Sequence, residues 1–89
     1  MPTLVLGSPE RGFYADGDLE INGDQLGELE VLPGDSDSAL ADALNGVDGV
    51  TATLSDGAIT VEWSGELVVG GQDPTGGGTL TNLQAGTYE

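Results

Sequence analysis

Residues 18–31, DLEINGDQLGELEV, alternate apolar and acidic side chains on both sides of an Asn22-Gly23 pair. A side-chain period of two is typical of a β-strand that has one face in the core and the other in water. Asn-Gly is the strongest short hairpin signal, because both central residues of a type I′ turn need a positive φ. The stretch therefore predicts a β-hairpin whose carboxylates form the water-facing side of a sheet.

The pattern changes its period in GDSDSALADALNGV, residues 34–47. Four apolar residues there follow the i, i+3, i+4, i+7 spacing of an amphipathic helix, namely Leu40, Ala43, Leu44 and Val47. Asp35 or Ser36 can cap the first turn, where Asp37 also favours the positive end of the helix dipole. Gly46 is placed to end the helix in a left-handed conformation. We therefore expect a short helix that depends on docking against a sheet.

A second hairpin is predicted by GVTATLSDGAITVEW, residues 49–63, with its turn at Asp56-Gly57. Around these elements, residues 3–6 favour a strand and residues 8–17 favour a loop. Two weaker strands are expected near the C-terminus, at Leu67–Val69 and Thr79–Leu83. Between them lies GGQDPTGGG, which is typical of a flexible connector.

These patterns predict one small domain over residues 1–89. Its class is α+β, mostly β: an antiparallel sheet of two hairpins with one short helix packed on it. The hairpin-helix-hairpin core (ββαββ) spans residues 17–63, and Gly-rich strands follow at 64–89. The predicted core residues are Leu19, Ile21, Leu29, Val31, Leu40, Leu44, Val50, Leu54, Ile59, Val61 and Trp63. Trp63 could instead anchor an interface, but its alternation with Ile59 and Val61 favours the core.

The charge balance limits the chemistry that the chain can perform. Sixteen acids stand against one base, Arg11, and the formal net charge is −15. Phosphate backbones would be repelled, so we expect no direct nucleic-acid binding. The sequence has no histidine, cysteine or lysine, which leaves no side chain suited to activating a serine nucleophile. The acidity itself fits adaptation to concentrated salt, a basic protein partner or mimicry of DNA, and we favour the first because every lysine is missing.

The acids do not follow a known metal-binding spacing. An EF-hand loop that starts at Asp16 or at Asp35 would lack both its sixth-position glycine and its twelfth-position glutamate. A looser calcium site at Asp16, Asp18 and Asp24 stays open as an alternative to a solvated strand edge, which we favour. We therefore predict no catalytic, cofactor-binding or metal-binding residue, and no enzyme activity.

The order of elements in residues 17–63 resembles the flagellin hook IN motif, a small module of flagellin outer domains and filament cap proteins. The likeness lies in INGDQLG, in the acid-capped GDSDSALADALN helix and in GVTATLSDG with the strand after it. In the family an Ile-Asn pair ends the helix, and here Leu44 and Asn45 stand in that place. The resemblance implies a ββαββ structural module displayed on a particle or extracellular surface, without catalytic residues.

A flagellin also needs long terminal helices, which this sequence does not show, so we expect the motif to be used as a stand-alone chain. We expect a structural or assembly protein of a tailed-virus virion, such as a capsid decoration, turret, fibre or tail protein of a virus of a salt-loving host. Expected partners are other virion or filament structural proteins and repeated copies of the chain, without a membrane span or cofactor. The alternatives are a flagellar or adhesive appendage on the extracellular surface, and an acidic inhibitor that mimics DNA.

Overall fold

Short antiparallel strands surround one core in the computed structural model, which describes residues 2–74 and 83–89. The elements in chain order are β1 (Thr3–Val5), β2 (Gly12–Tyr14), β3 (Glu20–Ile21), β4 (Asp24–Gln25), β5 (Leu29–Val31), the 3-10 turn η1 (Pro33–Asp35), α1 (Ala39–Asn45), β6 (Val50–Ser55), β7 (Ala58–Trp63), β8 (Leu67–Gly70) and β9 (Gly86–Tyr88). The α+β, mostly β class predicted from the sequence is confirmed.

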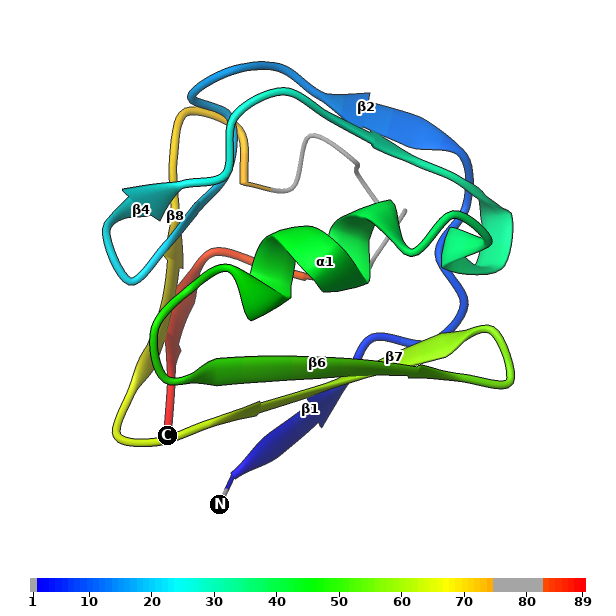
Figure 1. Cartoon of the computed structure of the whole chain (residues 1–89). Coiled ribbons are helices and arrows are strands. Elements are labelled where there is room, and N and C mark those ends of the chain that lie inside the picture. The colour runs from blue at the N-terminus through cyan, green and yellow to red at the C-terminus, as the bar shows by residue number, and fades with distance from the viewer. Residues whose placement is uncertain (1, 75–82) are drawn as a thin grey trace.

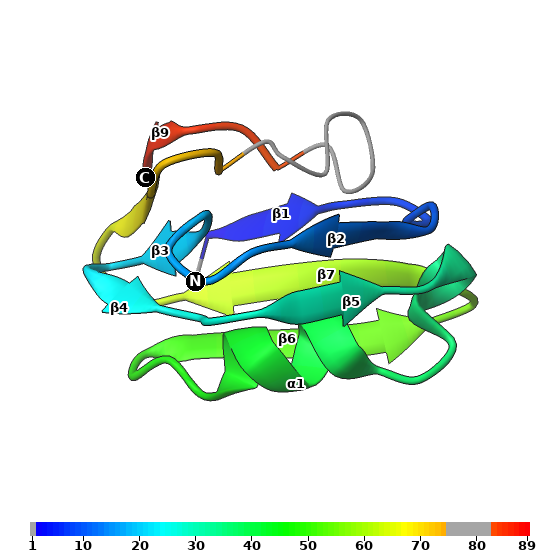
Figure 2. The same cartoon turned by 90° about the horizontal axis from the view of Figure 1, so that it is seen from above.

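The strands form three antiparallel sheets, ordered β1-β7-β6, β2-β5 and β4-β3-β8-β9. In Figure 1 the first sheet lies at the base of the molecule, the β2-β5 pair lies at the top, and the third sheet closes one side. The helix α1 packs against β6 and β5 and so bridges base and top. The view from above shows α1 along one side of the strands (Figure 2). The helix therefore covers one open side of the strand assembly.

Both predicted hairpin turns have the expected backbone conformation. Asn22 and Gly23 have φ of 54° and 86°, and Asp56 and Gly57 have φ of 53° and 78°. Two consecutive positive φ values define the type I′ turn, whose twist matches that of the flanking strands. These two turns are thus confirmed.

The first hairpin is shorter than predicted. Its pairing ends where the Leu26 N–H donates to the Leu19 carbonyl at 3.1 Å, because Gly27, with φ of 73°, then redirects the chain. As a result β5 does not continue the hairpin but pairs with β2, in the segment that we expected to be a loop. The prediction of a loop over residues 8–17 was wrong for Gly12–Tyr14.

The start of α1 is fixed by Asp35, one of the two caps that were predicted, and not by Ser36. This side chain is fully buried, and its two carboxylate oxygens accept the N–H groups of Leu40 and Ala41, each at 3.1 Å. A carboxylate at this place satisfies N–H groups of the first turn that have no partner within the helix. The predicted end is wrong in detail: Gly46 has a right-handed φ of −75° and donates to the Asp42 and Ala43 carbonyls. The positive φ comes later, at Gly49.

The other end of α1 is tied to the neighbouring sheet by Asn45. Its amide nitrogen donates to the Ala52 carbonyl and its amide oxygen accepts the Ala52 N–H, both at 2.8 Å. Two residues opposite each other in an antiparallel sheet exchange the same pair of hydrogen bonds. The Asn45 amide therefore takes the place of a neighbouring strand at the outer edge of β6.

The core contains the residues predicted for it, of which Leu54 alone is only partly buried. It also extends beyond the predicted set, to Leu6, Tyr14, Ala41, Val47, Ala52, Leu67, Val69 and Leu83. Trp63 is buried as expected, and its ring meets Tyr88 edge-on, with 6.3 Å between centroids and 71° between planes. Both ends of the chain thus contribute to the same core as residues 17–63.

The C-terminal part differs from its prediction in two ways. The strand β8 is confirmed, whereas β9 was not predicted, and most of the expected strand Thr79–Leu83 lies outside the described residues. The described start of the connector is packed on the first hairpin: a Cβ at Gly71 would lie 2.5 Å from the Asp18 carbonyl oxygen. That contact explains the glycine, because a real Cβ does not approach backbone so closely.

Candidate interaction surface

The carboxylates form an outer coat. Asp35 is the buried acid, Asp18, Glu20 and Glu62 are half-buried, and the other acids are exposed. The acids of the opening stretch lie on the water-facing side of the chain, as their alternation predicted. The single cation, Arg11, makes an exposed ion pair with Glu30 at 3.3 Å, and such a pair contributes little to stability.

The structure does not gather the acids that could bind calcium. The Asp18 carboxylate accepts the Ala15 N–H at 2.9 Å and so closes a local turn, while Asp16 and Asp24 are exposed. Among the described residues no group of three or more histidine, cysteine, aspartate or glutamate side chains could hold a metal ion. Asp24 lies elsewhere, at the tip of the first hairpin.

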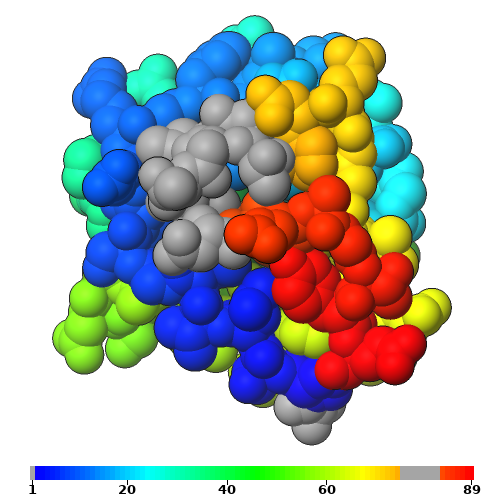
Figure 3. Space-filling view, turned by 180° about the vertical axis from the view of Figure 1, so that it is seen from behind, coloured from blue at the N-terminus to red at the C-terminus, as the bar shows by residue number. Residues whose placement is uncertain are grey.

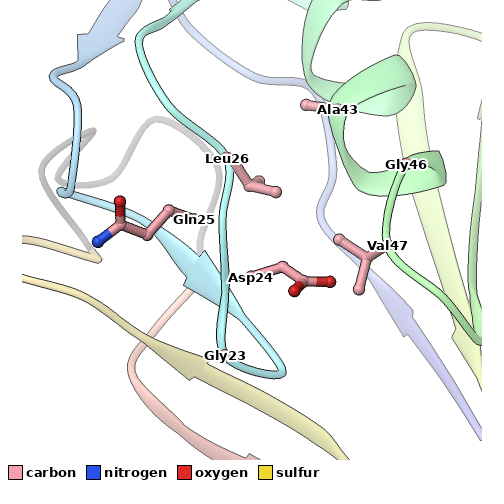
Figure 4. A pocket seen from close by; sticks show the side chains of 7 residues that line it. All are labelled: Gly23, Asp24, Gln25, Leu26, Ala43, Gly46 and Val47. Atoms are coloured by element: carbon pink, nitrogen blue, oxygen red, sulfur yellow. The ribbon is translucent and has the colours of Figure 1, made fainter.

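A shallow hollow of about 430 Å³ lies between that tip and the end of α1. Figure 4 shows Leu26, Ala43 and Val47 along its walls, with the Asp24 carboxylate turned toward it and Gln25 turned away. Asp24 is the one ionisable group in its lining, so the hollow holds no pair of groups for acid–base chemistry.

The outer face of the β1-β7-β6 sheet has a different character from the rest of the surface. It is the face opposite the core, and its strands carry outward the side chains of Thr3, Val5, Thr51, Thr53, Ser55, Ala58, Thr60 and Glu62. We call this set the threonine face. Its side chains form rows across the three strands, Thr51–Glu62–Thr3 and Thr53–Thr60–Val5. The face lies on the underside of the base in Figure 1.

The threonine face is nearly free of charge. Glu62 is its only ionisable side chain, although the chain as a whole carries a formal charge of −15. Val5, with 62% of its surface exposed, is the most exposed large apolar residue among the described ones. A surface patch with few charges and with exposed β-branched side chains needs less desolvation to form a protein contact than the acidic coat does.

The two outer edges of this sheet also differ. The edge of β6 is covered at Ala52 by the Asn45 amide and at Val50, whose N–H donates to the Val47 carbonyl at 3.1 Å. The edge of β1 has no such cover: within the described residues no strand pairs with its outer side. Figure 3 shows this N-terminal segment, in dark blue, at the molecular surface beside the red C-terminal strand. An uncovered strand edge presents main-chain groups that can pair with another chain.

Sequence reasoning did not identify the threonine face, yet the signal was present in the second hairpin. Its outward positions hold threonine and serine where the first hairpin holds aspartate and glutamate. The periodicity predicted which positions point outward. The two hairpins differ in the charge of the residues at those positions.

Comparison of the sequence with models of known protein families gives no match, and comparison with curated protein sequences gives none either. In the described part of the chain, no helix has the length and apolar character needed to cross a lipid bilayer.

Proposed function

We propose that this chain is a non-enzymatic structural protein that docks through its threonine face onto the surface of a larger particle. The particle that best fits the sequence is a tailed-virus virion, where the chain would serve as a capsid decoration, turret, fibre or tail component. The observation that carries this proposal is the uneven charge of the surface. A strongly acidic coat leaves one sheet face with Glu62 as its single acid and with Val5 exposed.

The resemblance to the flagellin hook IN motif supports the same proposal, because the residues at the motif's positions have structural roles in this chain. Leu44 and Asn45, which stand where that family has its Ile-Asn pair, both have structural roles in this chain. Leu44 is buried in the core, and Asn45 joins the end of α1 to the edge of β6. The buried acid, Asp35, is likewise committed to the helix start.

A charge placed on the threonine face tests the proposal. Thr53 is exposed at the centre of β6, so Thr53→Asp should leave the fold intact, at a cost of at most about 1 kcal/mol in β-propensity. In cells that make both wild-type and variant chains, we expect Thr53→Asp to be incorporated into particles at least about tenfold less, which needs only 1.4 kcal/mol of lost contact energy. Mass spectrometry of purified particles gives the ratio.

The matched control is Thr87→Asp, the same change at an exposed position of β9 away from the threonine face. It should enter particles as wild type does. Equal incorporation of both variants would show that the threonine face does not dock. Recovery of the wild-type chain with a nucleic-acid enzyme, and not with particles, would favour the DNA-mimic alternative.

A further inference from the structure

We propose that two copies of this chain pair through their β1 strands and join two three-stranded sheets into one six-stranded sheet. The inference rests on the proposed function, because it names a second copy as one partner in assembly and doubles the area of the docking face. It is carried by the direction of the main-chain groups of β1, by the side chains around them and by the position of Glu62.

The hydrogen bonds to β7 fix which groups of β1 are free. The Pro2 carbonyl accepts the Trp63 N–H at 3.4 Å, and the Leu6 N–H donates to the Ile59 carbonyl at 2.8 Å. Alternate residues of an antiparallel strand direct both main-chain groups to the same side. Leu4 therefore faces β7 together with Pro2 and Leu6, whereas the N–H and C=O groups of Thr3 and Val5 face outward.

A two-fold axis through Leu4 brings these free groups together. Antiparallel pairing about that axis places Thr3 opposite the partner's Val5 and Val5 opposite the partner's Thr3. Each of these two pairs exchanges two hydrogen bonds, as the hydrogen-bonded pairs of an antiparallel ladder do. The contact is isologous and closes on itself, so it yields a dimer and leaves neither β1 edge open. It also sets the exposed Val5 side chain against a threonine on the same face.

The charges around β1 allow a second copy despite the acidity of the chain. Residues 2–9 contain no charged side chain. The nearest acid on the threonine face is Glu62, which lies on β7 directly opposite Thr3. In the paired sheet the two copies of Glu62 are separated by three strand spacings across the sheet and by two residues along the strands. With standard strand dimensions, the distance between them is about 16 Å. That separation exceeds the Debye length of about 8 Å at physiological salt.

Other strand edges fit a second copy less well. The β4 edge contains Asp24, and the β9 edge is followed directly by Glu89, so pairing two copies there would bring carboxylates together. Acidic residues beside the edge would favour a basic strand from another protein, but β1 contains no acidic residue. The uncharged PTLVLG segment, residues 2–7, is therefore matched best by itself.

Sedimentation velocity of the purified full chain tests the pairing, with salt raised from dilute buffer to about 1 M, where the Debye length falls to about 3 Å. We expect a dimer whose population grows with protein concentration and with salt. Val5→Pro removes an outward N–H without removing a bond to β7, and an edge strand tolerates proline. It should raise the dimer dissociation constant at least about tenfold. Val5→Thr, which keeps the N–H and the β-branch, should leave the constant within about twofold.

Val5→Glu provides a second disrupting variant if the proline variant does not fold, because the side chain is exposed and thermal melts can confirm the fold. It should also prevent dimerisation, most strongly at low salt. A wild-type chain that stays monomeric at high concentration and high salt would overturn the inference. So would a dimer that persists unchanged in folded Val5→Pro or Val5→Glu. A dimer that forms in solution but never enters particles would instead refute the proposed function and leave the pairing intact.

Discussion

Replacement of Leu44 by alanine is expected to reduce the free energy of unfolding by about 2–5 kcal/mol, the usual range for a buried leucine. Leu44 is 1% exposed, and α1 packs against both β6 and β5. A helix of seven residues is too short to be stable alone, so its contacts with the sheets hold it in place. The cavity left by the missing side chain therefore weakens the joint between the base and the top of the molecule. Urea unfolding followed by circular dichroism measures the change.

The same substitution at Leu54 gives the matched control. Leu54 lies near the end of β6 and is only partly buried against the core. Leu54→Ala should cost less than Leu44→Ala, because fewer contacts are lost and solvent fills the space. Equal losses, or a Leu44→Ala change within experimental error, would show that α1 does not dock as described.

The melting temperature is expected to rise by roughly 10 °C or more between dilute buffer and about 1 M salt. Two unit charges 10 Å apart in water repel by about 0.4 kcal/mol, so about a dozen neighbouring pairs sum to a few kcal/mol. Each 1 kcal/mol moves the melting temperature of a domain of this size by about 4–8 °C. The exposed acids face one cation, Arg11, which is already paired with Glu30. The unfolded chain holds the same charges further apart and gains less from screening.

Sodium chloride and sodium sulfate should be compared at matched ionic strength, because sulfate also favours apolar burial. Screening raises the melting temperature in both salts and saturates near the molar range. A chain adapted to concentrated salt should continue to gain stability above that range. A melting temperature that does not change with salt would exclude the salt-adaptation interpretation and favour the DNA-mimic alternative, since such a protein must be well folded in dilute buffer.

Local patterns in the sequence predicted the parts of the fold that depend on neighbouring residues. The two turns, the helix, its Asp35 cap and most of the core follow from φ preferences and side-chain periodicity. Strand pairing was harder to predict, because β2 and β5 pair with each other although the β3-β4 hairpin lies between them in the sequence. The strand β9 contains Gly86 and Thr87, which give no apolar alternation to recognise.

The candidate surface could be predicted only in part. Periodicity assigned Thr51, Thr53 and Thr60 to outward positions. The part of the face on β1 depends on the pairing of Val5 with Thr60, two residues that are far apart in the sequence. The cover on the β6 edge depends on where the Asn45 side chain reaches, which no spacing rule indicates. Such an asymmetry becomes visible only when the hydrogen bonds of each edge are followed.

The proposed function is tested most directly by quantitative mass spectrometry of virions purified from the source of this chain, with flagellar filaments purified in parallel. The account predicts that the chain is present in virions in repeated copies, in a fixed ratio to the major structural proteins, and that it stays bound through density-gradient purification in concentrated salt. Its presence in filaments alone would support the appendage alternative. Its absence from both particles, with recovery in the free protein fraction, would contradict the proposal.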